Sequence, residues 1–271
     1  MKPVRFEKYE GLGNDFVLLE HDRDDAVTPS LVRAICDRRF GVGGDGVLVL
    51  LPPSTPGAAA RMRVVNADGS VPEMCGNGLR CAVLHVARKR TMRAGELVFD
   101  TDAGTRSCVV RDDDQITIDM GEVRVTGEMR IDLDGDAWDL VTADAGNPHA
   151  VAIRDVPHAR FAEVGPRLAT HPTFSAGTNV ELARFRAGGI DLDVWERGVG
   201  LTLACGTGAC ATAAVAVAKG AFAAGAEIPV RLPGGTLHVT MTPSGHAIMR
   251  GPARHAFGGE LDLDDYAKRA R

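Results

Sequence analysis

The sequence predicts an α/β (α+β) fold of two similar domains, each a β-sheet wrapped around a central α-helix. Three observations support this fold class. The chain has 271 residues, which is about two domains at the usual ~150 residues per domain. Two of its helical stretches are apolar on nearly every side, as buried helices are. Four short motifs also recur in the same order in both halves of the chain.

The composition excludes several classes of protein. Hydrophobic residues make up 45% of the chain and charged residues 25%, which are globular values that argue against disorder. A formal net charge of −5 and an aromatic content of 5% argue against a nucleic-acid binder. Six cysteines are too few for a disulfide scaffold. The first residues, MKPVRFEKYEG, lack the apolar core of a signal peptide, so we expect a cytoplasmic protein with free thiols.

Short strand-like runs, bounded by Gly, Asp or Pro, follow one another along the chain. In the first half they are VRFEKYE, DFVLLE, VLVLL, RMRVVN, ELVFDT, SCVVRD and QITIDM. In the second half they are DLVTAD, AVAIRD, VELARF, DLDVWER, EIPVRLP, TLHVTMT and AIMRG. We expect a hairpin turn at residues 111–114, RDDD, and a solvated end in the tail LDLDDYAKRAR.

Helices are fewer. Residues 30–39 are predicted to be helical, with Thr28 or Ser30 as N-cap and Pro29 in the first turn. Residues 78–90 and 208–223 are the two predicted central helices. The second of these lies partly in the stretch 198–218, which has no charged residue and is long enough to span a membrane. Because Gly-x-Gly pairs interrupt that stretch, we interpret it as a loop followed by a buried helix.

The internal repeat consists of four motif pairs. GLGNDFV matches DAGNPHAV, VGGDG matches AGTNV, VNADG matches VWERG, and MCGNG matches ACGTG. They pair Asn14 with Asn147, Asp45 with Asn179, Asn66 with Glu196 and Cys75 with Cys205, at separations of 130 to 134 residues. Each half therefore places one Cys-Gly-x-Gly at the start of one buried helix.

The position of each motif cysteine at the start of a helix predicts a reactive thiol beside an anion-binding site. A helix start presents backbone N–H groups and a partial positive charge, which together bind anions. A thiol at such a site is expected to have its pKa lowered from ~8.5 towards the range ~3.5–7.5. If the two halves face each other, one thiol could remove a proton from a substrate carbon while the other delivers a proton to the opposite face. Such an exchange inverts a stereocentre and needs two groups whose pKa values are pushed apart.

The motifs GLGNDF, FGVGGDG, NADGS, MCGNG, GNPH, GTNVE, ERGVG and ACGTGACA together resemble those of the diaminopimelate epimerases over essentially the whole chain. The resemblance implies the diaminopimelate epimerase-like fold. It also implies cofactor-independent interconversion of L,L- and meso-diaminopimelate, on the route to lysine and peptidoglycan. It further implies a homodimer.

The resemblance also assigns roles to residues. Cys75 corresponds to the proton donor and Cys205 to the proton acceptor, with the labels exchanging with direction. His149 and Glu196 correspond to residues that tune the thiols, and Glu196 with Arg197 forms the family's Glu-Arg pair, suited to an ammonium and a distal carboxylate. The expected substrate-binding residues are Asn14, Asn66, Gly76, Asn77, Asn147, Asn179, Glu196, Arg197, Gly206 and Thr207. One departure is Gly46, where some members carry a substrate-contacting Gln.

We expect domains of residues 1–118 with 252–271, carrying Cys75, and 119–251, carrying Cys205. Neither a Cys-x-x-Cys pair nor a His-Glu-x-x-His motif is present, so no metal or other cofactor is predicted. The expected partners are a small-molecule substrate and a second copy of the chain, with no nucleic acid and no membrane. The remaining cysteines, expected to be structural, are Cys36, Cys81, Cys108 and Cys210.

Three alternatives remain open. A proline or hydroxyproline racemase would share paired cysteines, but its substrate lacks the distal groups that Glu196 and Arg197 fit. A thiol–disulfide redox protein would need a nearby resolving cysteine. A non-catalytic amino-acid-binding protein would not exchange substrate protons with solvent.

Overall fold

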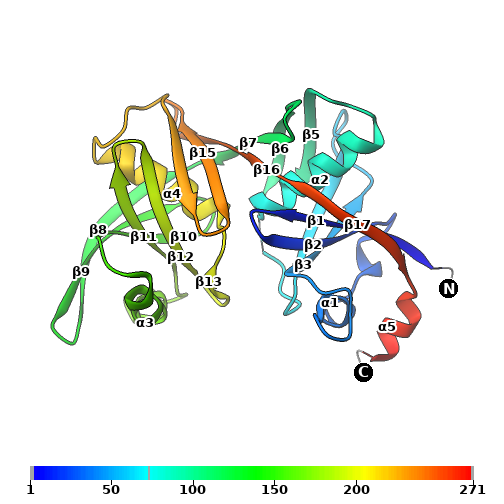
Figure 1. The fold of residues 1–271 in the computed structure, drawn as a ribbon, viewed down its shortest axis with the longest axis horizontal. Coiled ribbons are helices and arrows are strands. Elements are labelled where there is room, and N and C mark those ends of the chain that lie inside the picture. Colours follow the sequence, from blue (N-terminus) through cyan, green and yellow to red (C-terminus); the bar gives the residue numbers. More distant parts are fainter. Residues whose placement is uncertain (1–2, 73, 270–271) are drawn as a thin grey trace. The chain divides into compact units, whose positions relative to one another are not determined.

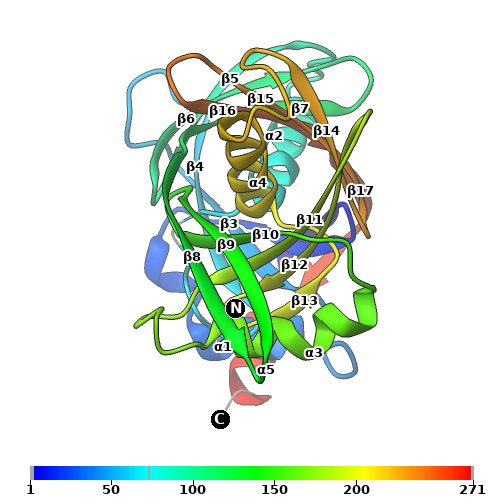
Figure 2. The same ribbon diagram turned by 90° about the vertical axis from the view of Figure 1, so that its left-hand side faces the viewer.

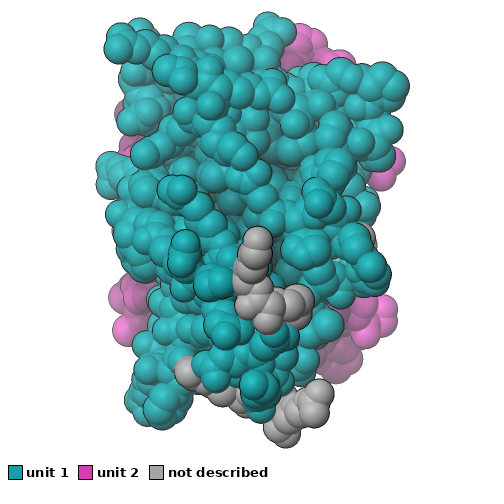
Figure 3. Space-filling model, turned by 90° about the vertical axis from the view of Figure 1, so that its right-hand side faces the viewer, with its two compact units in different colours: residues 1–118, 251–271 teal, residues 119–250 magenta. Residues whose placement is uncertain are grey.

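The computed structural model describes residues 3–72 and 74–269, and the chain divides into two compact units. Unit 1 contains residues 1–118 and 251–271, and unit 2 contains residues 119–250. Figure 3 shows the surface of the first in teal and part of the second in magenta. Two strands, β7 (Gln115–Glu122) and β16 (His246–Pro252), carry the chain across the boundary between the units.

Unit 1 is built mainly of strands (Figure 1). Its other strands are β1 (Val4–Gly11), β2 (Asn14–Glu20), β3 (Gly46–Leu51), β4 (Ala60–Asn66), β5 (Gly95–Thr101), β6 (Gly104–Val110) and β17 (Arg254–Leu261). Its helices are α1 (Pro29–Cys36), α2 (Gly76–Lys89), α5 (Leu263–Arg269) and a 3-10 turn, η1 (Asp24–Ala26). The strands pair in the order β17-β1-β2-β3-β4-β5-β6-β7, and only β2–β3 and β4–β5 are parallel.

Unit 2 repeats this plan. Its other strands are β8 (Arg124–Leu133), β9 (Asp136–Asp144), β10 (Pro148–Ile153), β11 (Asn179–Arg186), β12 (Gly189–Glu196), β13 (Gly200–Thr202), β14 (Glu227–Leu232) and β15 (Gly235–Met241). Its helices are α3 (His158–Ala169) and α4 (Gly206–Ala218). The order is β8-β9-β10-β11-β12-β14-β15-β16, and the parallel pairs are again the third and the fifth, β10–β11 and β12–β14.

A single helix fills the inside of each sheet. Helix α2 contacts β1, β2, β3, β4, β6 and β17, and α4 contacts β8, β9, β10, β11, β14 and β15. Figure 2 shows α4 enclosed by the strands of its unit. All residues from Gly206 to Ala216 are buried, and most are Ala, Gly or Thr, whose small side chains let strands approach on every side. The predicted fold class is confirmed.

The outer face of each sheet is covered by a second, amphipathic helix. Leu31, Val32 and Ile35 of α1 pack with strands β1, β2 and β3. In unit 2, Phe161 and Leu168 of α3 pack with β9, β10 and β11 around the fully buried Trp138. Each unit therefore has a helix–sheet–helix cross-section with its own core.

The helix predictions were right in place and imperfect at their ends. Thr28 caps α1 and accepts a hydrogen bond from Leu31 N, as predicted, but α1 stops at Cys36 rather than at residue 39. The side chain of Asp37 accepts hydrogen bonds from the N–H groups of Arg39 and Phe40 instead. Helix α4 ends at Ala218 rather than at residue 223, because Gly220 adopts a positive φ of 71°.

The sequence did not predict two helices and three strands, which are α3, α5, β8, β13 and β17. Helix α3 contains Gly165 and Pro166, which depress helix propensity. Helix α5 overturns the expectation of a solvated tail, since its Leu263 is buried and packs in the same core cluster as α1. The predicted hairpin turn at residues 111–114 is confirmed, with Asp114 at a φ of 60°.

No helix within the described ranges has the length and apolar character that crossing a bilayer requires. The uncharged stretch 198–218 instead forms the short strand β13 and the buried helix α4. The prediction of a loop followed by a buried helix is therefore close, with β13 added before the loop.

Candidate active site

Both motif cysteines cap the helix that fills their unit. Cys75 precedes α2 with φ −137° and ψ 100°, and Cys205 precedes α4 with φ −128° and ψ 115°. The Sγ of Cys75 accepts a hydrogen bond from Gly78 N at 3.3 Å. The Sγ of Cys205 accepts one from Gly208 N, also at 3.3 Å. Two helices that are separate in sequence thus begin with the same sulfur-capped turn.

The second glycine of each motif is required by packing. A Cβ at Gly78 would lie 2.8 Å from Leu48 Cδ2, and a Cβ at Gly208 would lie 2.9 Å from Glu181 Oε1. A larger residue would require the side chain of Leu48 or of Glu181 to shift. Gly76 and Asn77 begin α2, and Gly206 and Thr207 begin α4. The N–H groups in the first turn of a helix point out of its N-terminus, which suits a helix start to an anion.

In unit 1 a chain of side chains connects the helix start to the GGDG loop. Arg80 donates to Asn77 Oδ1 at 2.8 Å, and Asn77 Nδ2 donates to Asn14 Oδ1 at 3.2 Å. Asn14 Nδ2 in turn donates to Asp45 Oδ2 at 2.9 Å, and the guanidinium of Arg38 donates to Asp45 Oδ1 at 2.8 Å. The predicted residues Asn14 and Asn77 are therefore brought together, and Arg80 and Asp45, which were not predicted, hold them.

Asn66 stands at the end of β4, where Gly46 of β3 pairs with it. Its side-chain amide donates to Ser70 Oγ at 3.0 Å across the tight turn that follows. A Cβ at Gly46 would lie 2.7 Å from the carbonyl oxygen of Val65. A glutamine at this position would need a shifted β3–β4 pair, which explains the departure noted in the sequence.

In unit 2 the Cys205 thiol lies among polar side chains while being 5% exposed. Its Sγ is 3.5 Å from Thr207 Oγ1. Burial raises the pKa of Glu196, and hydrogen bonds from Thr202 and the Cys205 thiol partly offset that rise. The Thr202 bond to Glu196 Oε1 is 2.6 Å long. Glu196 and Cys205 thus influence each other's pKa.

The expectation of a lowered thiol pKa is wrong for Cys205. Burial raises the pKa of this thiol well above its ordinary value, and the carboxyl groups of Glu196 and Glu181 raise it further. The hydrogen bonds from Thr207 and Gly208 oppose this rise without cancelling it. A helix start stabilises a thiolate only modestly, so two nearby carboxyl groups and the loss of solvent outweigh it.

His149 forms a buried hydrogen-bonded chain with Asn147 and Glu181. Its Nε2 is 2.8 Å from Asn147 Oδ1, and its Nδ1 is 2.6 Å from Glu181 Oε1. Both nitrogens are therefore engaged within unit 2. Glu181 was not predicted, although a charged residue inside a buried strand, two positions after Asn179 in GTNVE, is a recognisable signal.

Asn179 and Arg197 form the other side of this site. Asn179 pairs with His149 in the β10–β11 register, and its side chain donates to Pro148 O at 3.0 Å. Its Oδ1 accepts a hydrogen bond from Arg197 N at 2.9 Å. The Arg197 guanidinium is exposed and donates to Ala176 O at 3.1 Å. This arrangement leaves other N–H groups of the fork for a carboxylate.

The other four cysteines, Cys36, Cys81, Cys108 and Cys210, are buried and free. Burial raises the pKa of Cys36 and of Cys108 to about 12. These thiols have the surroundings of structural rather than reactive cysteines. Within residues 3–72 and 74–269, no cluster of three or more His, Cys, Asp or Glu side chains could hold a metal ion.

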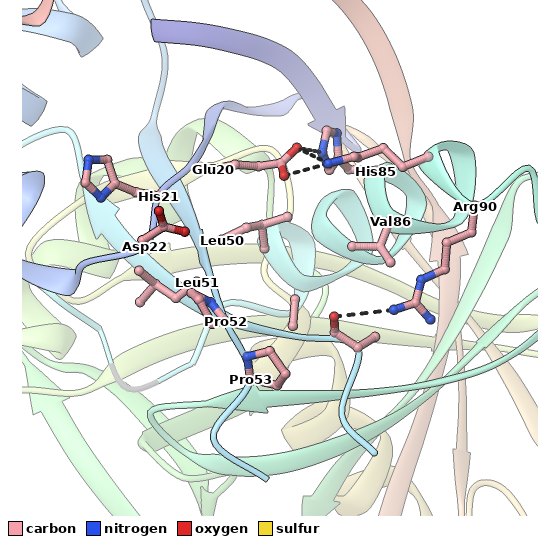
Figure 4. Close-up of a pocket in the computed structure, with 13 residues that line it drawn as sticks. Glu20, His21, Asp22, Leu50, Leu51, Pro52, Pro53, His85, Val86 and Arg90 are labelled. Atoms are coloured by element: carbon pink, nitrogen blue, oxygen red, sulfur yellow. Dashed lines mark hydrogen bonds and ion pairs between the residues drawn. The ribbon is translucent and has the colours of Figure 1, made fainter. Parts of the chain in front are cut away.

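A pocket of about 550 Å³ in unit 1 lies elsewhere (Figure 4). It is lined by the C-terminal end of α2, including His85 and Lys89, which both bond to Glu20. Helix α2 has 14 residues, so this end is roughly 20 Å from Cys75. None of the predicted site residues lines this pocket. We therefore place the candidate site at the two cysteine-capped helix starts, which carry the reactive groups, rather than in this pocket.

Comparison with known proteins identifies the family of this chain. The family model "Diaminopimelate epimerase" matches residues 6–126 and 141–256. A diaminopimelate epimerase from Thermosynechococcus vestitus is 40% identical over 95% of this chain and 99% of its own length. One from Desulfitobacterium hafniense is 38% identical over 95% of this chain and 98% of its own length.

Solved structures share the fold at low identity. A probable proline racemase from Agrobacterium radiobacter superposes with a TM-score of 0.79 at 16% identity, covering 98% of this chain and 95% of that one. A hydroxyproline epimerase from Agrobacterium vitis gives 0.78 at 15% identity, covering 96% and 91%. These likenesses concern the fold alone, whereas the family match covers most of the sequence and confirms the resemblance drawn from the motifs. The chain therefore belongs to the diaminopimelate epimerase family.

Proposed function

We propose that this protein epimerises L,L-diaminopimelate to meso-diaminopimelate through two thiols, without a cofactor. The observation that carries the proposal is the matched pair of cysteine-capped helix starts, one in each unit, each with a sulfur and anion-binding N–H groups in a single turn. Relatives up to 40% identical that carry the name diaminopimelate epimerase support the choice of substrate.

In the proposed reaction the Cys205 thiolate takes the proton from the substrate α-carbon and becomes a thiol. The electron pair left on carbon delocalises into the adjacent carboxylate, which the N–H groups of the helix starts stabilise. The Cys75 thiol then donates its proton to the opposite face of the same carbon and becomes a thiolate. The reverse direction exchanges these roles.

Glu196 is proposed to make the acceptor role of Cys205 possible. Because burial raises the pKa of Cys205, the thiol needs a base to lose its proton in the first place. Glu196 is close enough to that thiol to influence its pKa, and we propose that it takes the proton and returns it. We propose that His149 assists by holding Asn147, one of the substrate-binding amides.

The remaining groups are proposed to select the substrate. Asn14, Asn66, Asn77, Asn147 and Asn179 supply amides, and Gly76, Gly206 and Thr207 supply N–H groups. The exposed Arg197 fork suits the distal carboxylate of diaminopimelate and Glu196 its ammonium. A proline-type substrate has neither distal group.

We further propose that the lobes of the enzyme are residues 1–118 with 252–271 and residues 119–251. We also propose that it works as a cytoplasmic homodimer in lysine and peptidoglycan-precursor synthesis. Light scattering on the purified protein gives its mass directly. A mass near 28.6 kDa would exclude the dimer, and a mass of about twice that value would support it.

The deciding experiment is incubation of L,L-diaminopimelate in deuterium oxide, with exchange followed by mass spectrometry and stereochemistry by chiral chromatography. The wild type is expected to yield the meso form with deuterium at the inverted carbon. Cys75→Ala and Cys205→Ala are each expected to abolish epimerisation while remaining folded, and Cys210→Ala serves as the buried-cysteine control. Turnover retained in either motif variant refutes the two-thiol mechanism. Turnover of L-proline but not of diaminopimelate would establish the racemase alternative.

A further inference from the structure

Glu181 is a buried acidic residue that the proposed reaction does not use. Its side chain, on β11, is fully buried, as is that of His149. Its Oε1 contacts His149 Nδ1 at 2.6 Å. Its Oε2 is also buried and has no hydrogen-bond partner in the described part of the chain. Burying a carboxyl group with one oxygen unpaired costs free energy of folding, so its presence needs an explanation.

The contact between His149 and Asn147 fixes where one proton lies. An amide oxygen has no proton, so with Asn147 Oδ1 turned toward the ring at 2.8 Å, the Nε2 of His149 is the donor in this orientation of the amide. The Nδ1 is then a bare acceptor if the ring is neutral, or a second donor if the ring is an imidazolium. The hydrogen bond to Glu181 therefore has two possible forms, a carboxylic acid with a neutral imidazole or a carboxylate with an imidazolium.

The surroundings of Glu181 favour the neutral form. A charged Glu181 raises the pKa of Glu196, at the end of β12, and of Cys205, at the start of α4, so a negative charge on Glu181 works against ionising either group. The N–H of Gly208, which lies close to Glu181, is already donated to Cys205 Sγ. Burial raises the pKa of Glu181, and it outweighs the opposing effects of His149 and of a hydrogen bond from the Ala150 backbone, both on β10. An unpaired second oxygen also costs a neutral acid less than an anion.

We propose that Glu181 is a protonated positioning residue that sets the polarity of a hydrogen-bond relay ending at the substrate. Its O–H donates to His149 Nδ1, and His149 Nε2–H donates to Asn147 Oδ1. Asn147 is half-buried, unlike the other two, and its amide is thereby turned so that its N–H groups, rather than its oxygen, meet a carboxylate. This inference rests on the proposed function, since it specifies how that site recognises the carboxylate of its substrate.

The opposite polarity would defeat binding. If His149 carried its proton on Nδ1 only, the bare Nε2 would require Asn147 to donate, and the amide oxygen would then face the substrate carboxylate. Two acceptors facing each other in a partly dry site repel. A carboxylic acid at Glu181 excludes that tautomer, because its O–H donates to Nδ1 and leaves the proton of the neutral ring on Nε2. The proton on Glu181 therefore matters for substrate affinity more than for the chemical step.

The test compares Glu181→Gln with Glu181→Leu. A glutamine amide can donate to His149 Nδ1 as the carboxylic acid does, whereas leucine cannot. We expect Gln to keep KM for L,L-diaminopimelate within about 3-fold of wild type and Leu to raise it roughly 10-fold or more, with a smaller change in kcat. Asp119→Asn, which alters the surface pair of Asp119 with His246, is the control and should leave KM unchanged.

Nitrogen-15 NMR of the His149 ring supplies a second readout that needs no turnover. The wild type and Glu181→Gln should both show a neutral ring protonated at Nε2 at pH 7, and Glu181→Leu a mixture of tautomers. An imidazolium in the wild type, or a Gln variant as impaired as Leu, overturns the inference even if Leu fails to fold. A wild type that does not turn over diaminopimelate but shows the neutral Nε2–H ring would refute the proposed function while leaving the relay intact.

Discussion

Replacing Gly208 by alanine tests the central packing claim about the second lobe's site. At most internal helix positions a Gly→Ala change stabilises by about 1 kcal/mol, because alanine loses less conformational entropy. Gly208 is different because a Cβ there would lie 2.9 Å from Glu181 Oε1 and 3.3 Å from Cys205 Sγ. Neither atom is free to move, since Glu181 is fully buried and bonded to His149.

The expected magnitude follows from two opposing contributions. Overpacking a rigid site costs about 1–3 kcal/mol, from which the propensity gain of about 1 kcal/mol is subtracted. The net change is a loss of between zero and about 2 kcal/mol in the free energy of unfolding. Displacing the Glu181 carboxyl should also lower kcat/KM roughly 10-fold through His149 and Asn147.

Urea unfolding with linear extrapolation gives the stability change, and the deuterium-exchange reaction gives the activity. Gly188→Ala is the matched control, because a Cβ at Gly188 meets nothing within 4 Å; it should leave activity unchanged and should not destabilise the protein. A Gly208→Ala protein that is about 1 kcal/mol more stable than wild type and fully active would show that the site has room, and the packing argument would be wrong.

Three further changes test the other parts of the site and fold. Glu196→Gln removes the base proposed to deprotonate Cys205, so kcat should fall roughly 100-fold. The activity that remains should increase with pH only at a higher pH than in wild type, and an unchanged pH–rate profile would contradict the pairing. Arg197→Lys should raise KM strongly with little change in kcat, since an ammonium cannot form a bidentate fork; equal KM values would remove its carboxylate role. Hydrogen bonds from Thr55 and Ser54 hold the pKa of Asp100 well below its ordinary value, so its contribution to stability is complete above about pH 4 and is lost as pH falls through the lowered pKa. Asp100→Asn should therefore destabilise at pH 7 by about 1–3 kcal/mol, and urea unfolding should show that difference shrinking below pH 4; a constant difference would argue against the cause.

The local pattern of the sequence predicted most of the fold. Fourteen strand-like runs correspond to strands of the structure, and the three predicted helices all exist. What the pattern missed has physical reasons. Helix α3 contains Gly165 and Pro166 and is stabilised by packing on its sheet. Helix α5 is a short, charged segment anchored by Leu263. Strand β13 has three residues, too few for any alternation to be seen.

The motifs contributed more to the prediction of the candidate site than the expected electrostatics did. The cysteines, the glycines and the asparagines were all identifiable because each belongs to a short, chemically distinctive segment. Glu181 was overlooked although it lies in GTNVE, because its role depends on a neighbour 32 positions away, His149. The shift in the pKa of Cys205 was predicted in the wrong direction. The helix start can be recognised in the sequence, whereas the residues that bury the thiol cannot.

The sequence by itself determined that two cysteine-capped helices would exist, since a Gly-rich turn before an apolar helix is a local property of adjacent residues. It also determined the duplication, because motif order survives in the chain whatever the packing. Only the tertiary structure decided which strands enclose each helix. It therefore also decided how far each sulfur is shielded from solvent and which carboxyl groups surround it. Solvation and charge depend on distances between segments remote in sequence, and folding alone sets those distances.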